Sequence, residues 1–546
     1  MINRRLFLAG LTATAAAAST MSLAGCGGTS NGQPISGGTL RFGYETEPTT
    51  LNPHLSSQDT VTPLLRNAFD SYLYRDAQGT YHPWLAESYQ LSEDGLTLTL
   101  VLKEGITFSD GQALSADAVV KNFEKFTEKS YTATNRVGRA NLASWKAADA
   151  RTVVFTLTQP DNLFLAYLAS VSATPLSPAS LSAESLKSGG PGIAGVGPFT
   201  ITDYQQGASL TFSKREDYAW APEALTGRQG PAHLDAVQVS FLPEASTRVG
   251  SLQSGQLDII YGVPAQNVAS LNGTGGFSYQ EVLNSGTPYS LYLNVSKSPL
   301  DDVRVRRAFQ QAVDLSTLVE KVYYSTAKRA WSSISPVSSF YDPSLEGGAI
   351  TFDTKAANTL LDEAGWTGRD SAGYRTKDGK RLTVRLVSGA IYVRDVRDTL
   401  NLAIADQMKK NVGIEYIFQP VDEGTETERS ETNDYEVFDN TYNSPDVATA
   451  LDLLYNSDPT KGVIARGRYS DSQIDEWLNT ARAETNQEPR KTTYASFQNY
   501  VVKEKAYVLP LYVPRNSLAY SDKVKGTLVD EGSGSVFNAY NIWLVS

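Results

Sequence analysis

The sequence predicts an α/β protein built from two or three domains. Its 546 residues are too many for one hydrophobic core. In the second half, an expected strand at 382–387, a helix at 396–412 and a strand at 413–418 follow in β–α–β order. That order is typical of a parallel sheet with helices on its faces. The composition is that of a globular protein, with 41% hydrophobic and 20% charged residues.

Charge and residue counts exclude several classes of function. A net charge of −11 without a basic run argues against a nucleic-acid partner, because phosphate binding needs a basic face. The single cysteine excludes an internal disulfide and a cysteine-rich metal site. His54, His82 and His233 lie far apart without metal-ligand spacing. We therefore expect these histidines on the surface or in loops, and we expect neither a metal nor a cofactor.

The amino-terminal segment is predicted to be a targeting signal and not part of a folded domain. Arg4 and Arg5 precede an uncharged, alanine-rich stretch that is too short to span a membrane comfortably. Leu23-Ala24-Gly25-Cys26 resembles the lipobox of bacterial lipoproteins, which predicts a lipid on Cys26. The paired arginines also resemble a twin-arginine export signal. We predict a lipoprotein signal peptide over 1–25 and a flexible Gly- and Ser-rich tether over 26–38.

In the first half of the remaining chain, strands alternate with short helices. Leu96–Leu102 alternates apolar and polar residues, which predicts a strand with one buried face. The turn Phe108–Gly111 precedes a helix through Phe126, which Ser115 or Asp117 caps. Further strands are expected at 39–44, 150–157, 237–242 and 255–261, and further helices at 60–73, 161–169 and 244–253.

The second half begins with a strand at 291–295, a turn through Pro299 and one long helix. The helix is expected to begin near Asp301 and Asp302, whose carboxylates suit its first turn. Arg304, Arg306 and Arg307 are expected on its polar side or paired with those acids. Later elements are helices at 356–365, 474–482 and 488–505 and strands at 435–439 and 508–513.

Three segments carry a resemblance to a known family: GGTLRFGYETEPTTLNP at 37–53, LTLVLKEGITFSDG at 98–111 and LYLNVSKSPLDDVRVRRAFQQAVD at 291–314. They are similar to the extracytoplasmic solute-binding proteins of ABC importers, in family 5, which binds peptides and nickel complexes. Nothing in the second of these segments is catalytic.

The resemblance implies a two-lobed, periplasmic-binding-protein-like type II fold with a hinge and an extra subdomain on the first lobe. Lobe I would comprise 39–80, 195–288 and 512–546, with 508–513 returning to it. The subdomain would be 81–194 and lobe II 289–511. The implied function is that of a lipid-anchored monomer on the outer (periplasmic or cell-wall) side of the membrane. It would capture a peptide-like or other small solute and pass it to a permease that a separate ATPase drives.

Position in such a fold nominates residues that would contact the solute. Aromatic faces could stack on it, and Arg394 could hold a carboxylate with two donors. At 440–446, Thr and Ser stand where peptide-binding relatives are expected to hold the peptide amine with Asp, and Asp446 is expected to cap a helix through Leu454. The ligand could be a peptide, a modified peptide, a chelated metal, a siderophore or a sugar. The nominated residues are Tyr44, Glu45, Tyr261, Tyr289, Tyr292, Asn294, Tyr392, Arg394, Tyr442, Asn443 and Asp446.

Two other functions stay open. One is a sensor or chaperone-like lipoprotein that binds a solute without transport. The other is a secreted hydrolase, for which Ser325 and Lys328 form an S-x-x-K pattern without its companion motifs. The chain has no GxxxxGK[ST] motif and no G-x-S-x-G elbow between an expected strand and an expected helix, so we expect neither an ATPase nor an enzyme.

Overall fold

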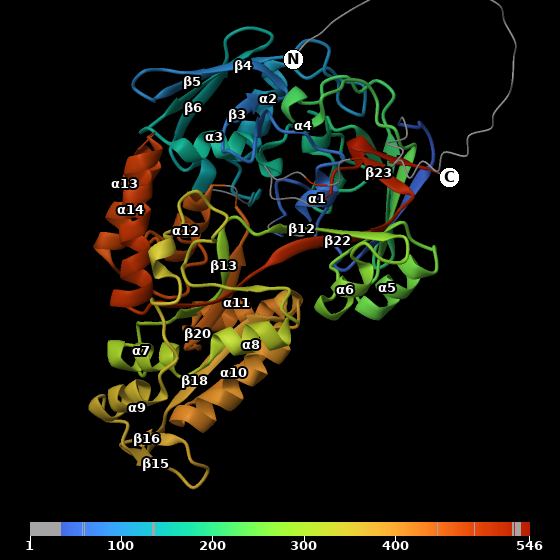
Figure 1. The fold of residues 1–546 in the computed structure, drawn as a ribbon. Helices are drawn as coiled ribbons and strands as arrows, with labels where there is room; N and C mark the ends of the chain where they lie inside the picture. The colour runs from blue at the N-terminus through green and yellow to red at the C-terminus, as the bar shows by residue number, and fades with distance from the viewer. Residues whose placement is uncertain are drawn as a thin grey trace, which may run out of the picture. The chain divides into compact units, whose positions relative to one another are not determined.

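The computed structural model describes residues 34–545, apart from 57, 59–60, 134–136, 445, 485, 527–528 and 530–536. The predicted signal peptide, Cys26 and the first part of the tether lie outside the described residues. Residues 35–546 form one compact unit, and Figure 1 traces its elements along the chain. None of the helices in the described part is long and apolar enough to cross a membrane.

One large sheet has seven strands, in the order β12-β22-β11-β1-β10-β9-β8. The central strand β1 (Thr39–Tyr44) is parallel to its two neighbours. Helix α5 (Ala245–Gln253) and the short α6 (Val268–Leu271) bury Val249, Leu252 and Leu271 in a cluster with residues of this sheet. The other strands are β8 (Phe199–Gln205), β9 (Ser209–Lys214), β10 (Ala236–Phe241), β11 (Ile259–Tyr261), β12 (Phe277–Leu283) and β22 (Arg515–Ser521).

The second large sheet has six strands, in the order β14-β21-β13-β20-β18-β19. Its strand β18 (Thr383–Gly389) is parallel to both β19 (Glu415–Val421) and β20 (Val437–Tyr442), which confirms the predicted parallel pairing. The other strands are β13 (Thr287–Leu293), β14 (Lys328–Arg329) and β21 (Val508–Val513). Its helices are α7 (Val303–Gln311), α8 (Leu315–Val322), α9 (Thr354–Glu363), α10 (Arg397–Val412), α11 (Glu423–Glu431), α12 (Val447–Tyr455), α13 (Ser472–Ala483) and α14 (Gln487–Asn499).

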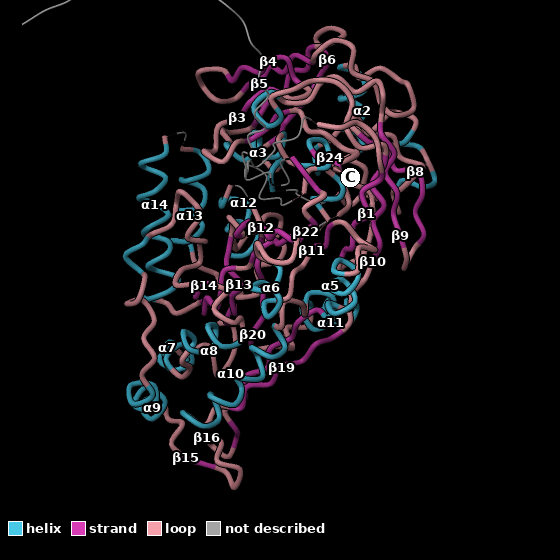
Figure 2. The backbone as a smooth tube through the Cα atoms, turned by 45° about the vertical axis from the view of Figure 1, so that its right-hand side comes forward, coloured by secondary structure: helices cyan, strands magenta, loops and turns pink. Residues whose placement is uncertain are grey.

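A third, four-stranded antiparallel sheet has the order β4-β5-β7-β6, and Figure 2 shows it beside α2 and α3. The predicted strand at 96–102 is β5 (Thr97–Leu102), which buries Leu98, Leu100 and Leu102. The remaining elements of this subdomain are β4 (Ala86–Leu91), β6 (Leu142–Ala147), β7 (Thr152–Leu157), α2 (Ala116–Lys125) and α3 (Asn162–Leu168). Ser115 caps α2, because its Oγ accepts a hydrogen bond from Ala118 N at 3.2 Å.

Several short elements complete the fold. Helices α1 (Thr62–Leu65) and α4 (Glu223–Thr226) have four residues each. The small sheets are β2 (Leu73–Arg75) with β3 (Tyr81–Pro83), β15 (Gly368–Arg369) with β16 (Arg375–Lys377) and β17 (Lys380–Arg381), and β23 (Val524–Gly526) with β24 (Ile542–Leu544).

The chain passes between the two large sheets at two adjacent places. It leaves β12 and enters β13 through residues 284–286, and it leaves β21 and enters β22 through Pro514. Asn284 N donates a hydrogen bond to Pro514 O at 2.9 Å, so the two crossings are joined. The predicted strand at 508–513 therefore belongs to the six-stranded sheet, and β22 makes the return that we expected of it.

Local capping overturns the single long helix that the sequence predicted after Pro299. Asp302 caps α7 by accepting from Arg304 N, and Asp314 caps a separate helix, α8, by accepting from Thr317 N. Arg304 pairs with Asp302 at 2.6 Å as predicted. Arg306 is buried instead of polar-facing, and its guanidinium donates to the backbone of Leu300 and Lys505.

Tertiary contacts overturn the helix predicted at 60–73. Only α1 forms, because the carbonyls of Asn67 and Ala68 accept hydrogen bonds from Phe199 N and Gly197 N, each at 2.9 Å. These carbonyls are then unavailable to a continuing helix.

Candidate functional site

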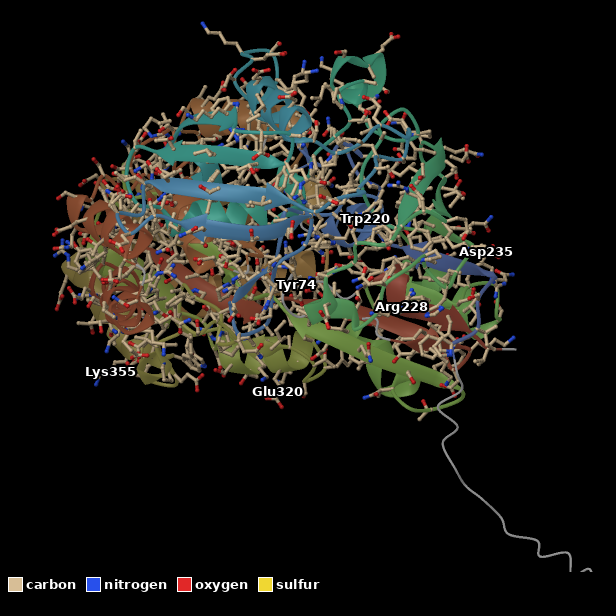
Figure 3. The ribbon with its side chains drawn as sticks, turned by 90° about the horizontal axis from the view of Figure 1, so that it is seen from above. Tyr74, Trp220, Arg228, Asp235, Glu320 and Lys355 are labelled. Carbon is tan, nitrogen blue, oxygen red and sulfur yellow. The ribbon has the colours of Figure 1, made fainter. Side chains whose placement is uncertain are left out.

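A cavity of about 670 Å³ lies at the carboxyl ends of β18 and β20. This is where open α/β sheets bind ligands, and the volume is within the roughly 300–1,000 Å³ of small-molecule sites. One wall comes from residues within 389–397, 423–427, 438–444 and 463–466 and from Asp446, around the six-stranded sheet. The facing wall comes from residues between 56 and 75 and from α3 and the turn after it. Tyr74, labelled in Figure 3, belongs to this facing wall.

The structure places six of the eleven nominated residues on the wall of this cavity. They come from β13, from the segment that precedes α10, and from the end of β20 and the loop between β20 and α12. These residues are Tyr289, Tyr392, Arg394, Tyr442, Asn443 and Asp446.

The other five nominated residues lie outside the cavity. The rings of Tyr44 and Tyr261, on two strands of the seven-stranded sheet, stack with their centroids 4.5 Å apart, and Glu45 lies 3.4 Å from Arg248. Tyr292 packs against the ring of Tyr455 in the core of the second lobe. Asn294 donates to Asn433 Oδ1 at 2.7 Å and to Tyr435 O at 3.0 Å.

Asp446 caps α12, as the sequence predicted. Its Oδ1 accepts from Ala448 N at 3.0 Å and lies 3.2 Å from Arg490 Nη2. Burial disfavours its charged form, but the attraction of Arg490 and Arg75 outweighs burial and lowers the pKa of Asp446. The carboxylate is therefore held ionised against the cavity wall.

Most charged residues that line the cavity are not among the nominated ones, namely Arg66, Arg75, Arg397, Glu423, Glu426, Asp439 and Arg466. One of them, Asp439, could have been nominated from the sequence, because it is the last residue of the strand predicted at 435–439. Ligands bind at the carboxyl ends of strands in a parallel sheet. Its Oδ2 accepts from Tyr289 OH at 2.6 Å and from Ser388 Oγ at 3.0 Å. Burial raises the pKa of Asp439. No pattern in the sequence indicates that Arg66 and Arg75 line a cavity.

The first crossing between the lobes contacts the cavity loop directly. Asn284 Nδ2 donates to Thr441 Oγ1 at 2.8 Å, and Ser285 Oγ donates to Ser444 O at 3.2 Å. Gly286 lies so close that a Cβ added to it would overlap Tyr442 O. The position of the loop at 441–444 is therefore coupled to the backbone of the crossing.

Gly286→Ala is expected to displace this loop and to cost about 1–3 kcal/mol of unfolding free energy, as overpacking does in a close-packed site. Urea denaturation measures the loss. Gly250→Ala is the matched control, because open space surrounds that position on α5. It should raise stability by about 0.5–1 kcal/mol. Equal effects of the two substitutions would contradict the close approach at Gly286.

The residues considered for catalysis or metal binding lie apart from the cavity. Ser325 and Lys328 do not line it. His54 lies in a turn, within the predicted class of surface or loop residues, but it is buried, with Nε2 2.7 Å from Thr174 O, and burial lowers its pKa to about 4. In the described part of the chain, no group of three or more His, Cys, Asp or Glu residues could hold a metal ion.

Comparison with known proteins places this geometry in a family. The chain is 24% identical over 511 residues to the oligopeptide-binding protein AppA of Bacillus subtilis, covering 91% of this chain and 90% of that protein. It is 30% identical over 352 residues to the dipeptide-binding protein of Escherichia coli, covering 60% and 63% of the two chains. The structure of AppA in complex with a nonapeptide matches with a TM-score of 0.80 and 23% identity, covering 94% of this chain and all of that one.

The fold is shared more widely. The crystal structure of NikA from Brucella suis in complex with Fe(III)-EDTA matches with a TM-score of 0.78 and 23% identity, over 93% of this chain and all of that one. These likenesses confirm the predicted two-lobed α/β fold. A family model described as bacterial extracellular solute-binding proteins, family 5 Middle, matches residues 80–462. The chain belongs to that family of bacterial extracellular solute-binding proteins.

Proposed function

We propose that the protein is the substrate-binding subunit of an ABC importer, which captures a peptide-like or related small solute and delivers it to a membrane permease. The observation that carries this proposal is the cavity of about 670 Å³. One of its walls comes from segments around the six-stranded sheet, and the other comes from residues between 56 and 75 and from α3. A solute that contacts both walls would favour a closed state over an open one. The named relatives bind oligopeptides and dipeptides, which supports a peptide-like ligand.

Within this proposal, the six nominated residues on the wall contact the solute. Tyr392 and Tyr442 offer aromatic faces, and Arg394 offers a planar set of donors that suits a carboxylate. The cavity also holds acidic side chains, so it suits a solute of mixed charge better than a purely apolar one.

Native mass spectrometry of the purified protein tests the proposal. We expect a bound small molecule that denaturation releases. Arg394→Ala should lower its occupancy at least ~10-fold, since a hydrogen bond to a charged group contributes about 1.5–3 kcal/mol. Arg307→Ala, at an exposed position outside the cavity, is the control and should retain the solute. Full occupancy in the Arg394 variant would show that this residue does not hold the solute.

Cys26 is proposed to carry the lipid that anchors the protein to the outer face of the membrane. The lipobox sequence Leu23–Cys26 supports this, and a tether of Gly and Ser would follow it. Cys26→Ser is expected to move the protein from the detergent phase to the aqueous phase in a Triton X-114 separation. An unaltered protein that already partitions into the aqueous phase would contradict the anchor.

A further inference from the structure

The carboxylate of Glu426, from α11, lies over the last residue of β18. Gly389 ends that strand, and a Cβ built there would clash with Glu426 Oε2 and lie 3.0 Å from Tyr392 Cδ2. The φ of Gly389 is −65°, which any residue can adopt, so glycine supplies space here. The missing side chain lets Glu426 and Tyr392 reach the same corner of the cavity.

Asp439 is a second carboxylate on the same wall, with only 8% of its surface exposed. Its Oδ2 accepts hydrogen bonds from Tyr289 OH and Ser388 Oγ, and neither of these side chains bonds to Oδ1. No residue that the structure describes donates a hydrogen bond to the carboxylate of Glu426. Burial raises the pKa of Glu426, and the charge of Asp439 raises it further. The negative charge of Asp439 thus disfavours ionisation of Glu426 when no cation lies between them.

The arginines nearby do not neutralise these acids by direct contact. Arg397 attracts Asp439 but makes its direct contacts elsewhere: its Nε donates to Tyr512 OH at 3.1 Å, and its guanidinium lies 4.2 Å from the ring centroid of Tyr289. Arg466 attracts Glu426, but its Nη1 donates to Val463 O, and within the described chain no ion pair joins it to Glu426. A further cation would therefore gain hydrogen bonds that the protein leaves unmade.

Aromatic side chains also line the cavity near Gly389. Tyr392 is 38% exposed, and Phe438 and Tyr442 also line the cavity. The faces of such rings attract cations, with an ammonium or guanidinium group held within about 6 Å of the ring. Carboxylates and aromatic rings together favour a positively charged nitrogen over a neutral polar group.

We propose that Glu426, Asp439 and Tyr392, around Gly389, form a cation subsite that binds an ammonium or guanidinium group of the solute. This inference rests on the proposed solute-binding function and deepens it. The solute class is then that of molecules with a cationic nitrogen, such as peptides with a free amine or a basic side chain. In this chain Glu426 and Asp439 would supply the negative charge that Thr441 and Ser444 in the neighbouring loop cannot.

Isothermal titration calorimetry with two matched peptide pairs tests the subsite. One pair is trialanine and N-acetyl-trialanine, and the other is N-acetyl-Ala-Arg-Ala and N-acetyl-Ala-citrulline-Ala. At least one charged peptide should bind ~10-fold or more tightly than its neutral counterpart. Glu426→Gln should reduce that preference to less than ~3-fold. Glu428→Gln, on the exposed side of α11, should leave it unchanged.

The outcomes separate the subsite from the function. Charged and neutral peptides that bind equally well, or a Glu426→Gln variant that keeps the preference, would overturn the subsite while the binding function stands. If no peptide binds but native mass spectrometry finds a bound solute, a cationic solute supports the subsite and a neutral or anionic one overturns it. If no peptide binds and no solute is bound, both proposals fail.

Discussion

Arg482→Ala is expected to lower the free energy of unfolding by about 3–5 kcal/mol, because it leaves buried carboxylates without their counter-ion. Arg482, on α13, is only 1% exposed. Its Nη2 and Nε lie 2.6 and 2.9 Å from the oxygens of Asp161, and its Nη1 lies 2.9 Å from Asp452 Oδ2. Urea denaturation followed by circular dichroism measures the loss.

The loss should be large because Arg482 joins two parts of the molecule. Asp161 caps α3 of the four-stranded subdomain, and Leu163 of that helix belongs to the hydrophobic core of the second lobe. Asp452 lies on α12. The variant would therefore loosen the docking of the subdomain as well as unpair two acids.

Arg381→Ala is the matched control for this prediction. Arg381 also contacts two carboxylates, those of Asp370 and Glu415, but its side chain is 38% exposed. Exposed pairs contribute about 0–1 kcal/mol. If the two variants lose similar stability, burial is not what makes the Arg482 cluster important.

The sequence predicted elements well where the signal is local. The alternation at 97–102 and the cap at Ser115 depend on residues close in the chain, and both are confirmed. The helix at 60–73 failed because a segment more than a hundred residues away takes the carbonyls of Asn67 and Ala68. The long helix predicted after Pro299 is instead two helices, because the carboxylate of Asp314 caps a new helix. The sequence alone does not distinguish such a cap from an Asp on the surface of one continuous helix.

The residues of the candidate site likewise divide into those that local sequence predicts and those that depend on distant contacts. Tyr392, Tyr442 and their neighbours could be nominated because they follow strands of one sheet, and the ends of parallel strands meet at one edge. The facing wall could not be predicted, because it depends on how the subdomain docks. That docking is decided by contacts such as Arg482 with Asp161, which are 321 residues apart in sequence. Periodicity carries no information at that separation.

The free energy of unfolding is also expected to depend strongly on pH, through the carboxyl group of Asp70. Asp70 is fully buried, and its Oδ2 accepts from Tyr218 OH at 2.8 Å, while Oδ1 has no partner among the described residues. Burial raises the pKa of the Asp70 carboxyl from 3.8 to about 7, although Tyr218, Arg66 and Arg215 oppose the shift. Between these two pH values the folded protein holds a proton that the unfolded chain has released.

The sign of the effect follows from this proton. The contribution of Asp70 to stability is complete below about pH 4 and is lost as the pH rises through about 7. A shift of about three pH units corresponds to about 4 kcal/mol. Asp70→Asn removes the titrating group, so the difference in unfolding free energy between the two proteins should change by that amount between about pH 4 and about pH 8.

Urea denaturation of both proteins at a series of pH values measures this difference. Every other titrating group is common to the two proteins, so their contributions cancel in the comparison. Parallel curves for the unaltered protein and the Asp70→Asn variant would show that the carboxyl is ionised in the folded state throughout. Because Arg66 both attracts Asp70 and lines the solute cavity, a confirmed shift would mean that the charge balance behind this wall changes near neutral pH.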